Sequence, residues 1–208
     1  MTRRCPGPTR ASLADRYQAP ASGPWVTCYV KEMLRPFPVR LVDYDPDWPR
    51  QAMERAARLR VLEPVLLAVH HIGSTAVPGL IAKPIIDLMP LVGDLAGLDL
   101  ERGAVEGLGY RWHGEYGIAG RRYCTADIGD RRVAQLHFFA MGSAQAHRHL
   151  AFRDYLRAHP SAVAAYAAEK RRARDLHPGD HHAYGAEKQG WIDRMEAQAL
   201  AWYAVRNG

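Results

Sequence analysis

The fold is decided by residues 70–88, which read HHIGSTAVPGLIAKPIIDL. This stretch joins two apolar runs whose length is typical of buried strands. The first run ends at Gly73-Ser74, where a glycine lets backbone amides approach a phosphate closely and a serine hydroxyl adds a donor. The second run carries Asp87, a lone carboxylate that is costly among apolar neighbours unless it is paired, hydrogen-bonded or metal-bound. A Gly-Ser turn beside an acidic strand is suited to Mg²⁺ and nucleotide phosphates together.

The pattern outside this stretch predicts a mixed sheet with flanking helices, followed by a helical half. Such an order favours an α+β fold over a doubly wound parallel sheet. Gly129-Asp130 predicts a tight hairpin turn between the last two strands. Asp47 and Asp94 are placed to cap the helices that follow them. Strands are predicted at 39–42, 65–72, 84–92, 110–113, 122–128 and 132–139, and helices at 48–60, 95–108, 144–158, 161–176 and 184–206.

The chain divides into a tail and one domain. Residues 1–36 contain five prolines and no sustained periodicity, which predicts a flexible N-terminal tail, and Met33 is an alternative to Met1 as the natural start. Residues 37–206 form the predicted domain. An apolar run long enough to span a bilayer is absent from the sequence, and the three cysteines lack a CxxC spacing, so we expect a cytoplasmic protein with no membrane partner.

The charge balance favours anionic small ligands. The formal net charge is +6 and the isoelectric point is about 9.4. Basic residues are scattered, and they do not alternate with aromatic residues as in RNA-binding sheets, so a nucleic-acid partner is not predicted. Phosphate ligands and a merely basic surface explain the charge equally well.

The decisive stretch also resembles a known family. Gly-Ser at a strand end followed by an acidic strand is similar to the nucleotidyltransferase superfamily, and HIGSTAVPGLIAKPIID is similar to the GrpB-like family. VRLVDYDPDW at residues 39–48 and FRDYL at residues 152–156 support the same resemblance, which covers about residues 37–204. Tyr/Lys pairs in the later helices also match that family. The resemblance implies a nucleotidyltransferase-like fold, and the family's occurrence beside a coenzyme A-pathway kinase implies an accessory role.

The sequence departs from the catalytic members of that superfamily at the metal site. Those members carry a second carboxylate two positions after the first, and here that position is Met89. On the later strand, His137 stands where a third acid is expected, as a base, a ligand or a core histidine. Asp87 is therefore the one predicted Mg²⁺ ligand, and metal binding should be weak without nucleotide.

Other candidate residues are basic or belong to the Gly-Ser turn. Each basic residue has a plainer interpretation as a solvated or structural side chain, and Arg122 is also a candidate ion-pair partner for Asp87. The predicted nucleotide- or phosphate-binding residues are Gly73, Ser74, Thr75, Lys83, Arg121, Arg122, Lys170 and Lys188, and the predicted catalytic residues are Asp87 and His137.

Two functions follow from these residues. The first is an enzyme that binds a nucleoside triphosphate with Mg²⁺ and transfers a nucleotidyl or phosphoryl group to a small-molecule acceptor. The alternative is an accessory module that binds nucleotide or phosphate and has lost the full metal centre. The missing carboxylate at Met89 favours the second function, whereas the turn and Asp87 support both.

Overall fold

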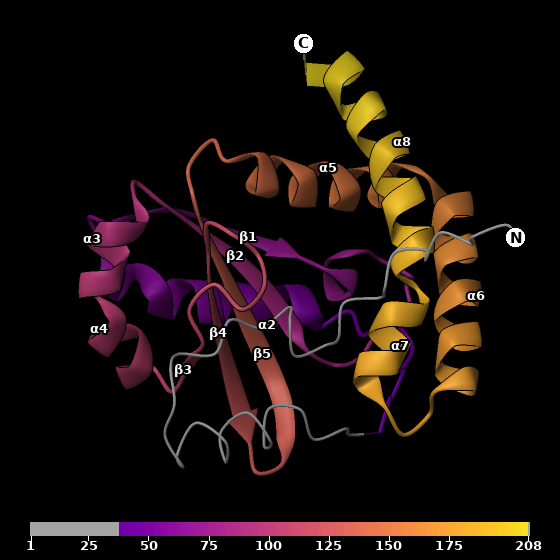
Figure 1. Cartoon of the computed structure of the whole chain (residues 1–208), viewed down its shortest axis with the longest axis horizontal. Helices are drawn as coiled ribbons and strands as arrows, with labels where there is room; N and C mark the ends of the chain where they lie inside the picture. Colours follow the sequence, from indigo (N-terminus) through magenta and orange to yellow (C-terminus); the bar gives the residue numbers. More distant parts are fainter. Residues whose placement is uncertain (1–37, 208) are drawn as a thin grey trace, which may run out of the picture.

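The computed structural model describes residues 38–207, and the predicted tail, residues 1–36, lies outside them. The strands are β1 (Leu66–Ile72), β2 (Ile86–Val92), β3 (Arg111–Trp112), β4 (Arg121–Ile128) and β5 (Arg131–Ala140). The α-helices are α2 (Trp48–Arg58), α3 (Leu95–Leu100), α4 (Arg102–Gly107), α5 (Ala144–Ala158), α6 (Pro160–Leu176), α7 (His181–Glu187) and α8 (Gln189–Asn207). Figure 1 shows a central sheet with α2 behind it, α5 above it, α3 and α4 on one side and α6 to α8 on the other.

Within the described residues, the strands form one mixed sheet in the order β1-β2-β5-β4-β3. Only β2 and β5 are parallel neighbours, and the other pairs are antiparallel. The predicted hairpin is present, because Ile128 pairs with Arg131 across Gly129-Asp130. The α+β prediction is confirmed, since strands and their covering helices come first and the helical half follows.

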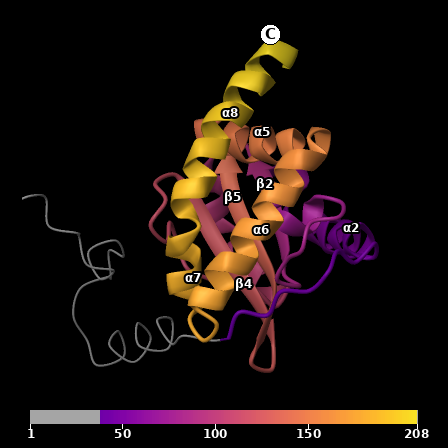
Figure 2. The ribbon, with the colours of Figure 1, turned by 90° about the vertical axis from the view of Figure 1, so that its right-hand side faces the viewer.

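Side chains alternate across the sheet and divide it into an apolar face and a partly polar face. Leu88 and Val92 on β2 belong to the main core, which also includes residues of α2, α3 and α4. Asp87 and Met89 point to the other face, where Met89 packs in a smaller apolar cluster with Ala146 of α5. Figure 2 shows α2 on one side of the sheet and the helical half on the other. The Asp87 side chain therefore faces the helical half.

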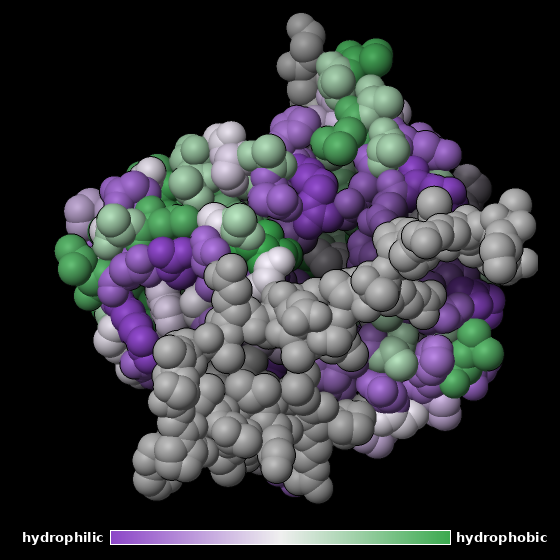
Figure 3. Space-filling view, in the orientation of Figure 1, coloured by the Kyte–Doolittle hydropathy of each residue, from purple (hydrophilic) through white to green (hydrophobic). Residues whose placement is uncertain are grey.

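The helical half is tied to the sheet and to itself by both packing and charge. Arg153 of α5 donates to the carbonyl of His71, and Arg157 donates to the carbonyl of Ala76, so α5 lies against the end of β1. Arg148 of α5 pairs with Glu196 of α8. Hydrophilic residues gather where α8 passes α5 on the face shown in Figure 3. These contacts hold α5 beside the Gly-Ser turn and join α8 to α5.

Some predicted elements differ from the structure. The predicted strand at 39–42 is only a bridge between Val42 and Ala82. The predicted helix at 95–108 divides at Glu101, whose φ of −88° and ψ of 8° leave the helical range. Asp94 does cap its start, by accepting from the Gly97 amide. At Asp47 the expected side-chain cap is absent, because that carboxylate bonds the Arg50 and Gln51 side chains instead.

The predicted last helix also divides, and the division matters for the site. Helix α7 begins at His181 because Asp180 accepts from the amides of His182 and Ala183. It ends at Glu187, Lys188 follows as its C-cap, and α8 starts at Gln189. No helix among residues 38–207 has both the length and the apolar character needed to cross a membrane.

Candidate functional site

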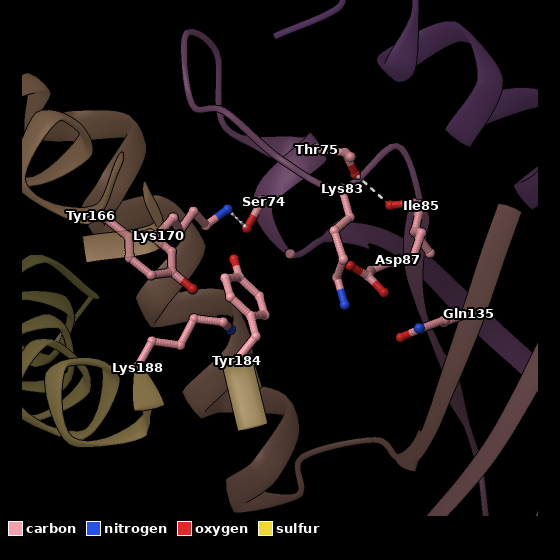
Figure 4. Close-up of a pocket in the computed structure, with 11 residues that line it drawn as sticks. Ser74, Thr75, Lys83, Ile85, Asp87, Gln135, Tyr166, Lys170, Tyr184 and Lys188 are labelled. Atoms are coloured by element: carbon pink, nitrogen blue, oxygen red, sulfur yellow. Dashed lines mark hydrogen bonds between the residues drawn. The ribbon is translucent and has the colours of Figure 1, made fainter. Parts of the chain in front are cut away.

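A polar pocket lies between the sheet and the helical half. Its volume is about 230 Å³, which is small beside the roughly 300–1,000 Å³ of typical small-molecule sites. Figure 4 shows side chains reaching it from the Gly-Ser turn, from β2 and β5, and from α6 and α7. The lining residues are Gly73, Ser74, Thr75, Lys83, Ile85, Asp87, Gln135, Tyr166, Lys170, Tyr184 and Lys188.

The Gly-Ser turn and Asp87 are in direct contact. Ile72 pairs with Asp87 across β1 and β2, so the turn that follows β1 lies over the carboxylate. Gly73 has φ 70° and ψ −168°, a backbone region that is open essentially to glycine alone. A Cβ at Gly73 would lie 2.4 Å from Oδ2 of Asp87. The glycine is therefore required twice, for its backbone conformation and for the approach of the carboxylate.

Three lysines line the pocket, and they come from separate parts of the chain. Lys83 precedes β2, Lys170 lies on α6, and Lys188 stands where α7 gives way to α8. The chain has 28 lysines and arginines, of which only four are lysines, and the fourth, Lys31, lies outside the described residues. Every lysine of the described residues therefore lines this pocket. Asp87 is the only acidic residue among its lining residues.

Burial disfavours the charged form of all three amines. It lowers the pKa of Lys83 to about 8, with repulsion from Lys188 adding to the effect. It lowers the pKa of Lys188 to about 8 as well, and Asp87 opposes that change. Lys170 is only 2% exposed, and burial lowers its pKa well below the usual range. The pocket therefore holds three amines that lose their protons more easily than a solvated lysine does.

Lys170 and Ser74 form the closest polar contact in the pocket. Lys170 Nζ is 2.5 Å from Ser74 Oγ and donates to the carbonyl of Ile81 at 2.8 Å. The Tyr166 hydroxyl also hydrogen-bonds Ser74, and its ring is stacked on Trp191 with centroids 4.6 Å apart. The serine side chain is thus held from the helical half by an amine and a phenol.

His137 lies beside Asp87 but is not among the residues that line the pocket. Its Nε2 is 3.6 Å from Oδ1 of Asp87. Gln135 pairs with Asp87 in the parallel register and lines the pocket, and His137, two residues further along β5, lies on the same face of the sheet. His137 therefore occupies the place expected for a third acid, within reach of the first.

The two predicted arginines lie elsewhere. Arg122 forms a bidentate ion pair with Asp99 at 2.6 Å, so the alternative in which it pairs with Asp87 is wrong. Arg121 is buried and donates to the backbone carbonyls of Glu115 and Tyr116. Neither arginine lines the pocket. Both hold the segment before β4 in place.

The donor set fits a protein-held Mg²⁺ poorly. Asp87 supplies one carboxylate, and the lysines around it repel a cation. Met89 is fully buried in the cluster under α5 and offers no ligand. No group of three or more histidine, cysteine or acidic side chains is arranged for a metal within residues 38–207. The expectation of magnesium stays a prediction that depends on oxygens supplied by a ligand.

The tyrosines and Gln135 were not predicted as site residues. A signal for the tyrosines is present in the sequence, because Tyr166 and Lys170 are four apart, as are Tyr184 and Lys188. Residues four apart share a helix face. In the structure Lys170 lies 4.7 Å from the Tyr166 ring centre and Lys188 lies 5.1 Å from that of Tyr184. The repeated Tyr-x-x-x-Lys spacing thus marks two helix faces that line one pocket.

The mixed sheet, the Gly-Ser turn at a strand end and the acidic neighbouring strand define the class as a nucleotidyltransferase-like α+β protein. The model of the GrpB protein family matches residues 38–198, and the chain belongs to the GrpB family. The crystal structure of the conserved protein GrpB from Enterococcus faecalis is similar, with a TM-score of 0.74, 37% identity, and coverage of 79% of this chain and 99% of that one.

Curated relatives include longer proteins. The UPF0157 protein YqkA of Bacillus subtilis is 38% identical over 170 residues, which cover 81% of this chain and 49% of that protein. A dephospho-CoA kinase of Mycolicibacterium paratuberculosis is 34% identical over 79% of this chain and 47% of its own length. The chain thus spans about half the length of these two relatives. The name dephospho-CoA kinase describes that relative over its full length, of which this chain matches 47%.

Proposed function

We propose that the pocket binds the phosphate end of a nucleotide or of another small phosphorylated molecule, and that its lysines supply most of the positive charge. The observation that carries this proposal is the convergence of Lys83, Lys170 and Lys188 around a single carboxylate. Three amines and one acid leave an excess of positive charge when the amines are protonated, which a phosphate dianion would balance. The protein in this proposal is a binding module without a two-metal transferase centre.

The size of the pocket supports recognition of a phosphate group more than of a whole nucleotide. A volume of about 230 Å³ holds one end of a ligand, so a nucleoside would extend out of it. The Gly73 backbone and the hydroxyl of Ser74 add donors beside the amines, which suits an oxygen-rich anion. Gln135 on β5 offers a further amide donor opposite the lysines.

The test is calorimetric titration of the protein with inorganic phosphate, pyrophosphate, AMP and ATP, each with EDTA and with Mg²⁺. We expect binding in EDTA and a loss of at least about tenfold in affinity in Lys188→Met. The matched control is Arg171→Met, which removes an exposed cation from the helix that carries Lys170. If Lys188→Met bound each of the four anions with the same affinity as the wild type, the proposal would be refuted.

A second function, nucleotidyl or phosphoryl transfer from a nucleoside triphosphate, is favoured by the contact between Asp87 and Gly73 and by His137 at 3.6 Å. In this function Asp87 would hold Mg²⁺ together with ligand phosphates, and His137 would act as a base toward the acceptor. Labelled nucleoside triphosphates in a metabolite mixture test it, because nucleotidyl transfer releases pyrophosphate and phosphoryl transfer releases the nucleoside diphosphate. Release that requires Mg²⁺ and is lost in Asp87→Asn would support the transferase over the binding module.

A further inference from the structure

The contact between Ser74 and Lys170 has the parts of a nucleophile and its base. Ser74 opens a single 3-10 turn, Ser74–Ala76, directly after Gly73 at the end of β1, and its side chain lines the pocket. Lys170 reaches it from α6, with 2.5 Å between Nζ and Oγ. Serine is a weak nucleophile until an adjacent base accepts its proton, and lysine serves as that base in some hydrolytic dyads.

The surroundings of Lys170 suit a neutral amine. Its side chain is buried, and no carboxylate of residues 38–207 forms an ion pair with it. Burial and repulsion from Lys188 and Lys83 lower its pKa. A neutral amine can donate one N–H to the Ile81 carbonyl and accept the Ser74 proton with its lone pair, so both observed contacts remain satisfied.

We propose that Ser74 is a nucleophile, that Lys170 is its general base, and that the pocket transfers an acyl group from an activated acyl donor through an ester on Ser74. Oγ forms a bond to the carbonyl carbon while its proton moves to Nζ. The bond from that carbon to the leaving group then breaks, and the leaving group departs with the bonding pair and takes the proton from Nζ. Water next attacks the ester, Nζ accepts its proton, and that proton returns to Oγ as the carboxylic acid leaves.

The remaining cations indicate which donors fit best. Lys83 and Lys188 line the same pocket as Ser74, so a leaving group or a developing oxyanion in that pocket would lie near their amines. Cations so placed stabilise negative charge that builds up during the reaction. An acyl phosphate, whose leaving group is a phosphate, therefore fits better than a neutral ester. This preference depends on the proposed phosphate binding, whereas the Ser74–Lys170 pair does not.

The experiment uses p-nitrophenyl acetate as a neutral probe and acetyl phosphate as an anionic one, each without added metal. We expect a burst of p-nitrophenolate and acetylation of the Ser74 peptide, seen by mass spectrometry and reversed by hydroxylamine, which cleaves esters but not amides. Ser74→Ala should abolish the label, and Lys170→Met should slow acylation by about 10²-fold or more. Lys170→Arg keeps the positive charge but cannot act as a base, so it should be as slow.

The controls separate the dyad from ordinary surface acetylation. Ser161→Ala removes an exposed serine on α6 and should leave the burst unchanged. Folding of each variant is checked by circular dichroism, and Ser74→Cys, which keeps a nucleophile in place, should retain labelling if Lys170 is the base. A burst of equal size in Ser74→Ala, or a hydroxylamine-stable label on lysines alone, would overturn the proposal. If p-nitrophenyl acetate labels Ser74 as well as acetyl phosphate does, the Ser74–Lys170 dyad is supported and only the preference for acyl phosphates is rejected.

Discussion

Binding of a phosphate ligand should be accompanied by proton uptake, because the anion favours the charged form of amines whose pKa is lowered by burial. In the empty pocket, the pKa of Lys83 and that of Lys188 are both lowered to about 8. An anion beside an amine favours the ammonium form and raises its pKa toward the usual value of about 10.4. At about pH 8 each lysine is half protonated, so binding should take up about one proton in total.

The same linkage fixes the direction of the pH dependence. Below about pH 7 both of these lysines are already protonated, and raising the pH changes affinity little through them. Above pH 8 the empty pocket loses its charge before the occupied one does, so affinity falls. Between pH 7 and about pH 9.5 the fall should be about 30-fold for each lysine that contacts the ligand.

The assay is calorimetric titration with AMP at pH 8, where its phosphate is already a dianion. Buffers of different ionisation enthalpy are compared, since the slope of the observed enthalpy gives the protons taken up by the protein. Lys188→Met should reduce the uptake by about half, because one of the two titrating amines is gone. Arg171→Met serves again as the exposed control and should leave it unchanged. An uptake of zero at pH 8, with equal affinity at pH 7 and about pH 9.5, would show that these amines do not contact the ligand.

Three further substitutions test single contacts of the site. Gly73→Ala should destabilise the fold by about 1–3 kcal/mol in urea unfolding, because its backbone is in a glycine-only region and a Cβ would meet Asp87, and a smaller loss would contradict the described turn. Asp87→Asn should tighten pyrophosphate binding in EDTA by about tenfold through loss of a like charge, and should remove any enhancement of ATP binding by Mg²⁺; weaker binding would contradict the charge argument. Met89→Asp should lower stability by more than about 3 kcal/mol without creating a metal site, since position 89 is fully buried, whereas Met89→Leu should cost less than about 1.5 kcal/mol.

The parts of the site that sequence reasoning predicted are those close together in the chain. Gly73 follows β1 and Asp87 lies near the start of the adjacent strand β2, and the pattern of strand, Gly-Ser turn and acidic strand was enough to predict that they lie together. Arg122 and Lys83 were both predicted to bind phosphate. Which of them reaches the pocket depends on loop geometry that no periodicity encodes. Arg122 has a partner in Asp99, which belongs to α3, and the sequence contains no signal for that pairing.

The helical half shows the limit of pattern reading most clearly. A continuous helix over 184–206 was predicted because its periodicity does not change at Lys188. The structure divides it there, since the Asp180 cap starts α7 early and α7 is short. The division places Lys188 at a helix end beside Tyr184, where its amine reaches the pocket. Helix α7 also packs against α6, and a contact of this kind is not encoded in the periodicity of the segment.

The choice of lysine over arginine connects the binding proposal with the dyad proposal. The chain uses arginine for nearly all of its basic positions, yet every basic residue that lines the pocket is a lysine. A guanidinium stays charged in any protein environment, so three of them would repel one another in the empty pocket. Amines can lose their protons there and regain them when an anion arrives. The same property lets Lys170, the most buried of the three, accept a proton from Ser74 in a pocket that Lys83 and Lys188 also line.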